Sequence, residues 1–274
     1  MVLLDKYLSS RPTHRVCQGL AHHGVPLAQG TITDGLQKIA VLFEPMMSKL
    51  YERQMREKRF HGDETRWEVF EEIEGKTGHR WYLWVMQSAS VVSDRMAPGR
   101  GADVPKGHFA PLRKDLVEVV LVCDRSSAYK SLALDCDVLM LAFCWAHVRR
   151  DFLKAARSWP EFERWMFGWV DAIRELSRLN AARLEQWDEQ LPLVQPAAAF
   201  AQGQRDVETK LRQMQERCEA HLQEPDLPLA KQKVLSSLPN HWDGLTVFVE
   251  RPAVAMDNNA AERIVRNPVV GRKN

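Results

Sequence analysis

The chain has 274 residues, of which 45% are hydrophobic and 27% charged, and its formal net charge at pH 7 is +2. This composition is typical of a globular protein of one large or two modest domains and excludes collagen-like, low-complexity and disordered chains. No stretch approaches the roughly 18 apolar residues of a membrane span, and the charged N-terminus lacks the apolar run of a signal peptide. The five cysteines form no C-x-x-C pair, which argues against a zinc knuckle and favours a reducing cytoplasm without a membrane partner.

Basic residues are clustered, although the total charge is nearly balanced. The clusters are RQMREKR at 53–59, HVRRDFLKAAR at 147–157 and RIVRNPVVGRKN at 263–274. Clusters of this kind can follow a phosphate backbone, and they can equally be solvated faces of helices.

Residues 1–58 have a helical pattern. Gly24 and Pro26 interrupt it, and Thr31 is the predicted N-cap of the helix that follows. Such a helix–turn–helix arrangement can enter a DNA groove, and it can equally be a plain helical hairpin.

The period changes to two after residue 60, which predicts strands over HGDETRWEVFEE and HRWYLWVMQ, joined by a turn at 74–78. The Gly- and Pro-rich stretch 95–111 predicts a loop. The run LVEVVLVCD at 116–124 predicts a strand buried on both faces, and a second such run lies within 135–146. A basic helix is expected from about His147.

Residues 159–250 repeat apolar side chains at helical spacing, and a last helix is expected between the N-cap Asp257 and a stop at Pro268. The plan is therefore an α/β core interrupted by an all-helical insertion. The predicted division is an N-terminal helical segment at 1–58, the first part of the core at 59–158, the insertion at 159–250 and the final core helix at 251–274.

Three carboxylates are candidates for a metal site. Asp124 ends the buried strand, where open α/β sheets place ligands, although it could instead cap the next helix. Asp63 lies on the strand face that alternation predicts to point inward, where a buried carboxylate needs a partner or a metal; Glu64 points the other way and is the alternative. Glu262 lies early in the last helix. Carboxylates without Cys or His ligands favour Mg²⁺ or Mn²⁺ over zinc.

Several strings in the chain resemble the signature segments of transposases of the insertion sequence 66 family. They are GDET at 62–65, CWAHVRR at 144–150 and DNNAAERIVRNPVVGRKN at 257–274. The resemblance runs over nearly the whole chain. It implies an RNase H-like mixed sheet with flanking helices, a helical insertion before the last carboxylate, and a DDE triad formed by Asp63, Asp124 and Glu262 with two Mg²⁺ or Mn²⁺ ions.

The expected activity is metal-dependent cleavage of transposon ends and strand transfer to target DNA, by a homo-oligomer assembled on DNA in the bacterial nucleoid. Accessory proteins of the same element are expected as further partners. The side chains expected to contact DNA are His147, Arg149, Arg150, Arg263, Arg266, Arg272 and Lys273.

Three departures from the family pattern bear on this expectation. Gly62 stands where Ala is frequent, and Arg125 and Ser126 stand where Gly-Tyr is usual after the second Asp. The chain also ends at Asn274, where family members usually continue, and begins without their N-terminal metal-binding segment. The alternatives are therefore a truncated, inactive DNA-binding relic or another RNase H-like nuclease.

Overall fold

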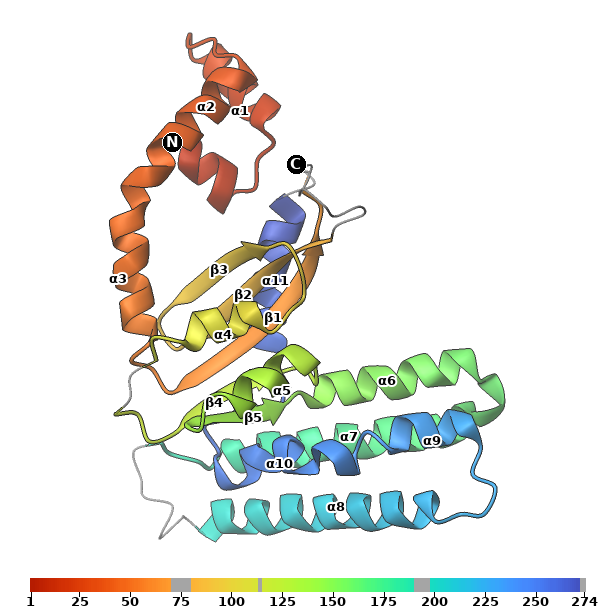
Figure 1. Cartoon of the computed structure of the whole chain (residues 1–274). Coiled ribbons are helices and arrows are strands. Elements are labelled where there is room, and N and C mark those ends of the chain that lie inside the picture. The colour runs from red at the N-terminus through yellow and green to blue at the C-terminus, as the bar shows by residue number, and fades with distance from the viewer. Residues whose placement is uncertain (70–79, 113–114, 190–197, 272–274) are drawn as a thin grey trace. The chain divides into compact units, whose positions relative to one another are not determined.

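The computed structural model describes residues 1–69, 80–112, 115–189 and 198–271, which form two compact units (Figure 1). Unit 1 consists of Met1–Val117 and Asn259–Asn274, and unit 2 of Glu118–Asn258. The predicted turn at 74–78 lies outside the described residues. In the part of the chain that is described, no helix is both long and apolar enough to cross a membrane.

Unit 1 begins with five short helices, of which the second and third enclose a small apolar core of Val16, Leu20 and Ile32. They are η1 (Leu4–Leu8), α1 (Thr13–His22), α2 (Gln29–Ala40), η2 (Val41–Phe43) and α3 (Glu44–Gln54). Thr31 lies inside α2, so the predicted N-cap is wrong: the N-cap is Ala28, three residues earlier, whose carbonyl already accepts a backbone hydrogen bond from Ile32. The connection 23–28 is longer than the 3–4-residue turn of a helix-turn-helix motif, which favours the plain hairpin.

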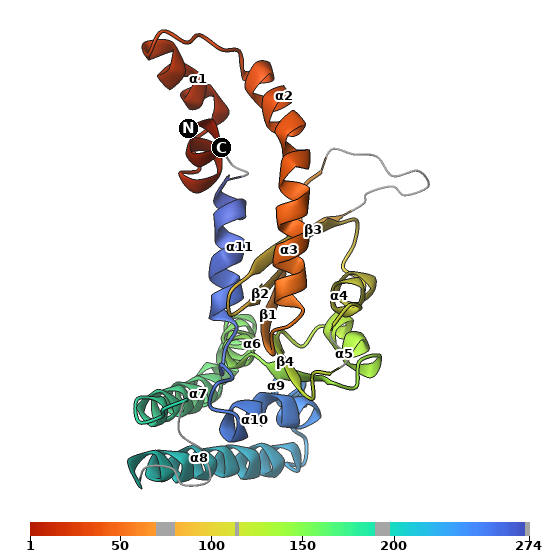
Figure 2. The same cartoon turned by 90° about the vertical axis from the view of Figure 1, so that its left-hand side faces the viewer.

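The strands of unit 1 are β1 (Arg59–Trp67), β2 (Trp81–Ser88) and β3 (Val92–Ala97), all antiparallel in the order β3-β2-β1. On one sheet face Leu83 and Val85 pack against Val265 of α11 (Asn259–Gly271). On the other face, α3, α4 (Asp103–Phe109) and the strands β2 and β3 line one cavity, and Figure 2 shows α3 lying along the sheet. On this face Gln54 of α3 donates a hydrogen bond of 2.8 Å to the backbone oxygen of Met86.

Two predicted boundaries in unit 1 are wrong. The stretch 95–111, predicted as a loop, contains the end of β3 and the whole of α4. Pro98, Gly99 and Gly101 lie in the connection between them, and Pro105 lies in the first turn of α4, where proline is tolerated. Pro268, predicted to end the last helix, lies inside α11, because Val269 beyond it packs on the same cluster as Val265.

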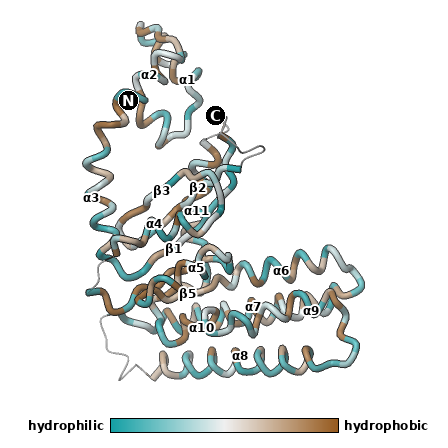
Figure 3. Tube along the Cα trace, in the orientation of Figure 1, coloured by the Kyte–Doolittle hydropathy of each residue, from teal (hydrophilic) through white to brown (hydrophobic). Residues whose placement is uncertain are grey.

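Unit 2 contains two parallel strands, β4 (Val119–Cys123) and β5 (Leu139–Phe143), paired from Val119 with Leu139 to Cys123 with Phe143. Every residue of β4 is buried, as predicted for a strand covered on both faces. Figure 3 shows hydrophobic colours concentrated around these strands, whereas α8 is mainly hydrophilic. The helix α5 (Ser127–Leu134) joins the two strands.

The rest of unit 2 is helical, as predicted for 159–250. Its helices are α6 (Trp145–Ser158), η3 (Pro160–Phe162), α7 (Glu163–Leu184), α8 (Ala198–Leu222), α9 (Leu229–Leu235), η4 (Pro239–His241) and α10 (Trp242–Glu250). The helix α7 packs between α6 and α8 through Trp169, Ile173 and Leu176. The helix α10 lies so close to β5 that a Cβ atom on Gly244 would be 2.4 Å from a ring carbon of Phe143.

The five described strands, three antiparallel in unit 1 and two parallel in unit 2, have flanking helices in both units. This confirms the predicted mixed α/β class, and it is consistent with an RNase H-like domain with additional helical parts. The compact units cut across the predicted domain boundaries, and the division by function stays a prediction.

Candidate active site

Asp63 lies in β1 on the sheet face that α11 covers. It is directly opposite Val85 of β2, and cross-strand neighbours point to the same face. Val85 is fully buried in the cluster that includes Val265 of α11. Asp63 is partly buried, and its Oδ1 accepts a hydrogen bond of 3.0 Å from the backbone N–H of Glu64. The inward direction predicted for this side chain therefore agrees with the register.

Glu64 occupies the opposite face of β1. Its side chain is only 1% exposed, and one carboxylate oxygen accepts a hydrogen bond from the guanidinium of Arg100. A buried carboxylate with an arginine partner has a structural reason to be charged. The ion pair with Arg100 gives Glu64 a structural role, and its part as the alternative metal ligand stays a prediction.

Glu262 lies in the first turn of α11. It precedes Val265 by three residues and Val269 by seven, so all three share one face of the helix. Val265 and Val269 belong to the cluster that packs on the sheet. The helix α11 and the strand β1 are therefore neighbours that carry Glu262 and Asp63, respectively, on the faces turned toward each other. Arg263 and Arg266 lie on the exposed side of α11.

Asp124 follows β4 directly, at the carboxyl end of the two parallel strands. Its Oδ1 accepts a hydrogen bond of 2.8 Å from the backbone N–H of Ser126. Ser126 is the N-cap of α5, where its hydroxyl accepts from the N–H of Ala128. The alternative that Asp124 itself caps the helix is therefore wrong: Asp124 shapes the turn one step before the cap.

Arg125, one of the departures from the family pattern, has a structural role in unit 2. Its guanidinium pairs with Asp151 of α6 and donates a hydrogen bond of 2.5 Å to the Ser237 hydroxyl. The side chain is 13% exposed. Arg125 thus joins the start of α5 to α6 and to the segment after α9. The departure from the family pattern at this position does not move Asp124 from the end of β4.

Two of the sequence strings meet in unit 2 although more than 100 residues separate them. The backbone N–H of Trp145 donates to the carbonyl of Met256 at 3.1 Å, and that of Asn258 donates to the Cys144 sulfur at 3.1 Å. Cys144 and Asn258 are fully buried, and burial raises the pKa of the Cys144 thiol. We call Met256–Asn258 the strap; it ties the chain just before α11 to the start of α6. Sequence reasoning missed it, although both strings had been singled out.

Cys144 and Trp145 pack in the core as predicted, and α6 begins at Trp145 rather than at His147. His147 is partly buried at this end of α6, whereas Arg149 and Arg150 are exposed on it. Lys154 and Arg157, which were not singled out individually, continue the exposed basic face of the same helix. Arg272 and Lys273 lie outside the described residues.

The three predicted carboxylates are divided between the units: Asp63 and Glu262 belong to unit 1 and Asp124 to unit 2. Over its described residues, neither unit holds by itself three or more His, Cys, Asp or Glu side chains grouped to bind a metal. The donor set is chemically suited to Mg²⁺ or Mn²⁺, since it consists of carboxylates alone.

The chain is similar in sequence to uncharacterized proteins of Sinorhizobium fredii. The uncharacterized protein y4jD of Sinorhizobium fredii is 25% identical over 290 residues, which cover 100% of this chain and 53% of that protein. The protein y4hP of the same organism is 21% identical and is covered to 50%. The chain thus spans about half the length of these relatives.

A solved structure of the simian T-cell lymphotropic virus intasome in complex with the PP2A regulatory subunit B56 gamma aligns with 55% of this chain and 48% of its own chain. Sequence identity there is 12% and the TM-score 0.23, which is too low to indicate a shared fold. The family model described as "Transposase IS66 family", in contrast, matches residues 1–274, the full length of the sequence. The chain therefore belongs to the IS66 family of transposases.

Proposed function

We propose that this chain is the catalytic part of a DDE transposase, which cleaves DNA at the ends of an insertion sequence and joins the freed 3′-hydroxyl to target DNA. Asp63, Asp124 and Glu262 are its catalytic and metal-binding carboxylates. The family supports a transposase role in general. The reaction and its residues are the part that we propose.

One observation carries the assignment of the residues. Asp63 and Glu262 lie on a strand and a helix that pack face to face in unit 1, while Asp124 stands at the carboxyl end of a buried parallel strand in unit 2. Strand ends of this kind are where α/β folds place their ligands. The proposal therefore requires that the Asp124 end of unit 2 come together with the Asp63–Glu262 pair of unit 1.

The carboxylates would hold two Mg²⁺ or Mn²⁺ ions. When bound, such ions supply an activated attacking oxygen and stabilise the leaving oxygen of a phosphodiester. The surrounding structure positions each carboxylate. Asp63 is positioned by the β1–β2 register and by the hydrogen bond that it accepts from the Glu64 N–H, and Asp124 by the hydrogen bond that it accepts from the Ser126 N–H. Glu262 is positioned by α11, whose Val265 and Val269 pack on the sheet of unit 1.

The DNA backbone is the proposed partner of the basic side chains of α6 and of α11. His147, Arg149 and Arg150 lie in the first two turns of α6, which starts beside the carboxyl ends of β4 and β5. Arg263 and Arg266 follow Glu262 on α11, and Arg272 and Lys273 follow in sequence. Such contacts position DNA without reading its sequence. Joining two transposon ends requires a homo-oligomer on DNA, and accessory proteins of the same element are further proposed partners.

The decisive experiment measures Mg²⁺- and Mn²⁺-dependent nicking and strand transfer on DNA with transposon ends. It compares the parent chain with Asp124→Asn and with Asp137→Asn, a matched control at an exposed carboxylate of the same unit. We expect Asp124→Asn to lower the rate at least about a hundredfold, because metal stabilisation of the transition state amounts to several kcal/mol. Asp137→Asn should keep the parent rate.

Equal rates in the parent chain and Asp124→Asn would remove Asp124 from the mechanism. No activity in any of the three proteins, with DNA binding retained, would favour the inactive relic. Activity that does not depend on transposon ends would favour a different RNase H-like nuclease.

A further inference from the structure

The strand β3 forms the edge of the unit 1 sheet. Among the strands that the structure describes, it pairs only with β2. Val92 and Met96 on this strand are 42% and 37% exposed, and Asp94 and Arg95 are exposed as well. An edge strand offers backbone N–H and C=O groups to an additional strand unless charged side chains or other structure prevent it.

A cavity of about 490 Å³ opens beside this edge, between α3, α4 and the sheet. Its walls include the apolar side chains Met47, Trp84, Met86 and Val104. The volume is within the usual range for sites that bind a ligand or an inserted side chain. Met46 and Met47 at the start of α3 are about half exposed, so the apolar surface continues beyond the cavity.

The charged side chains of β3 and one buried polar atom of the cavity have no partner among the residues that the structure describes. In the described part of the chain, neither Asp94 nor Arg95 has an ion-pair partner. His108, which is 8% exposed, lines the cavity, and its Nε2 is buried without a hydrogen-bond partner in the same described part. The positive charge of Arg95 acts on both His108 and Tyr51, so these polar groups lie close to one another.

The register of β3 with β2 shows to which face of the sheet each side chain of β3 points. Ser93 and Arg95 are paired with Met86 and Trp84, so they point to the sheet face that α3 and α4 cover, where the cavity lies. Asp94 is paired with Val85 and points to the other face. A strand added beside β3 would place alternate side chains on these two faces, about 7 Å apart along the same face.

We propose that β3 and the cavity bind an extended segment of a partner protein by antiparallel strand addition. The segment carries an acidic, a basic and a large apolar residue in consecutive positions. The acidic side chain lies opposite Arg95, the basic one opposite Asp94, and the apolar one opposite Ser93, from where it enters the cavity. Backbone hydrogen bonds give affinity in this mode, and the charges with the cavity give specificity. The proposal does not depend on the catalytic function.

The test uses synthetic nine-residue threonine peptides with a central Glu-Lys-Leu or, with the charges exchanged, Lys-Glu-Leu. Binding of each labelled peptide to the full chain is measured by fluorescence anisotropy. We expect saturable binding of the first peptide and about tenfold weaker binding of the second, since like charges then face each other at two positions. A chain carrying both Asp94→Lys and Arg95→Glu should reverse this preference.

Two further variants separate the contributions. Ser48→Trp places a large ring at an exposed position of the cavity lining and should weaken binding of the Glu-Lys-Leu peptide without lowering the melting temperature. Arg53→Glu makes the same charge change as Arg95→Glu, but on an exposed part of α3 that does not line the cavity. It should leave binding unchanged.

Equal binding of both peptides, or no binding of either, would overturn the proposal and leave Asp94 and Arg95 as charges that protect the edge from aggregation. Self-association of the chain that Arg95→Glu abolishes would also overturn it, because the occupant would then be a second copy.

Discussion

Two buried basic side chains, Arg183 in unit 2 and His108 in unit 1, are accommodated in opposite ways. Arg183 is 1% exposed and donates hydrogen bonds to Gln204, Asn180 and the carbonyls of Phe248 and Val249. Burial lowers its pKa to about 10, so it stays charged at neutral pH. Burial lowers the pKa of His108 from 6.5 to about 4, with a smaller contribution from the charge of Arg95, so His108 is neutral there.

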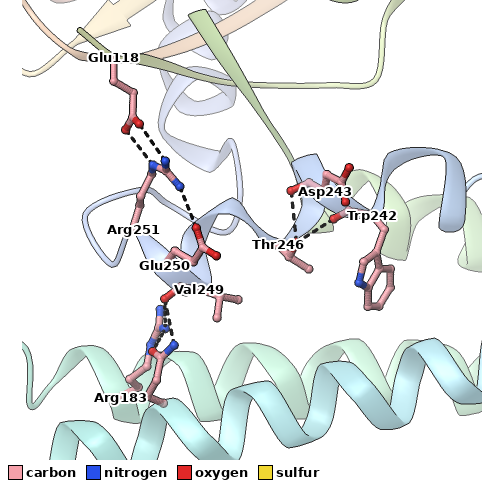
Figure 4. A network of polar contacts seen from close by, with 9 residues as sticks. Glu118, Arg183, Trp242, Asp243, Thr246, Val249, Glu250 and Arg251 are labelled. Carbon is pink, nitrogen blue, oxygen red and sulfur yellow. Dashed lines mark hydrogen bonds and ion pairs between the residues drawn. The ribbon is translucent and has the colours of Figure 1, made fainter. Parts of the chain in front are cut away.

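The difference shows which unit depends on a buried charge. Phe248 and Val249 lie near the end of α10, so Arg183 of α7 satisfies the last carbonyls of a helix from another part of the unit. Figure 4 shows its contact with Val249. In unit 2 the positive charge is part of the packing. In unit 1 the burial of His108 is tolerated only while its imidazole carries no charge. Lowering the pH should therefore destabilise unit 1 more than unit 2.

The largest effect is expected for Arg183→Met. The substitution leaves buried carbonyl groups of α10 without donors, and we expect it to lower the free energy of unfolding of unit 2 by about 3–4 kcal/mol. Amide hydrogen exchange, followed by mass spectrometry for peptides of each unit, measures the opening free energy separately. Arg178→Met, at an exposed position of the same helix, is the control and should change it little. Equal effects of the two substitutions would show that the Arg183 contacts contribute no more than a surface arginine.

A smaller effect is expected when unit 1 is acidified. The unfolded chain takes up a proton on His108 near pH 6.5, whereas the folded unit takes it up only near pH 4. Stability is therefore fully present above pH 6.5 and falls as the pH is lowered to 4, by up to about 3 kcal/mol. Burial also lowers the pKa values of His221 and His241 in unit 2, but both are only partly buried, so unit 2 should lose less.

Hydrogen exchange of unit 1 at pH 7 and at pH 4.5, corrected for intrinsic exchange rates, checks this prediction. His108→Gln should remove most of the loss in unit 1, and His14→Gln, at an exposed histidine of α1, should not. An unchanged loss in His108→Gln would assign the acid sensitivity to the carboxylates.

The sequence predicted the elements whose pattern comes from burial. Alternation located β1 and the face of Asp63, and a continuous apolar run located β4. The exposed edge strand β3 has no such pattern, because neither of its faces is buried along its length; its last residues and α4 lie in the stretch 95–111, which the sequence predicts as a loop. Propensity misplaced the end of α11 for a related reason: the packing of Val269 outweighs the cost of Pro268.

The candidate site was only partly predictable for a different physical reason. The strap depends on bonds between Cys144–Trp145 and Met256–Asn258, and no local pattern reports a backbone hydrogen bond across more than 100 residues. Resemblance singled out both strings without indicating that they meet. The role of Arg125 was likewise hidden, because its partners Asp151 and Ser237 come from distant parts of unit 2.

The smallest effect is expected at the surface of unit 2, where Arg251 donates two hydrogen bonds of 2.8 Å to Glu118 (Figure 4). These side chains are 29% and 45% exposed, so water already solvates both charges, unlike the guanidinium of Arg183. A double-mutant cycle with Glu118→Gln and Arg251→Gln should give a coupling energy of about 1 kcal/mol or less, which decreases as salt is added. A coupling as large as the effect of Arg183→Met would contradict the view that hydrogen bonds to a buried charge, rather than ion pairing as such, stabilise this unit.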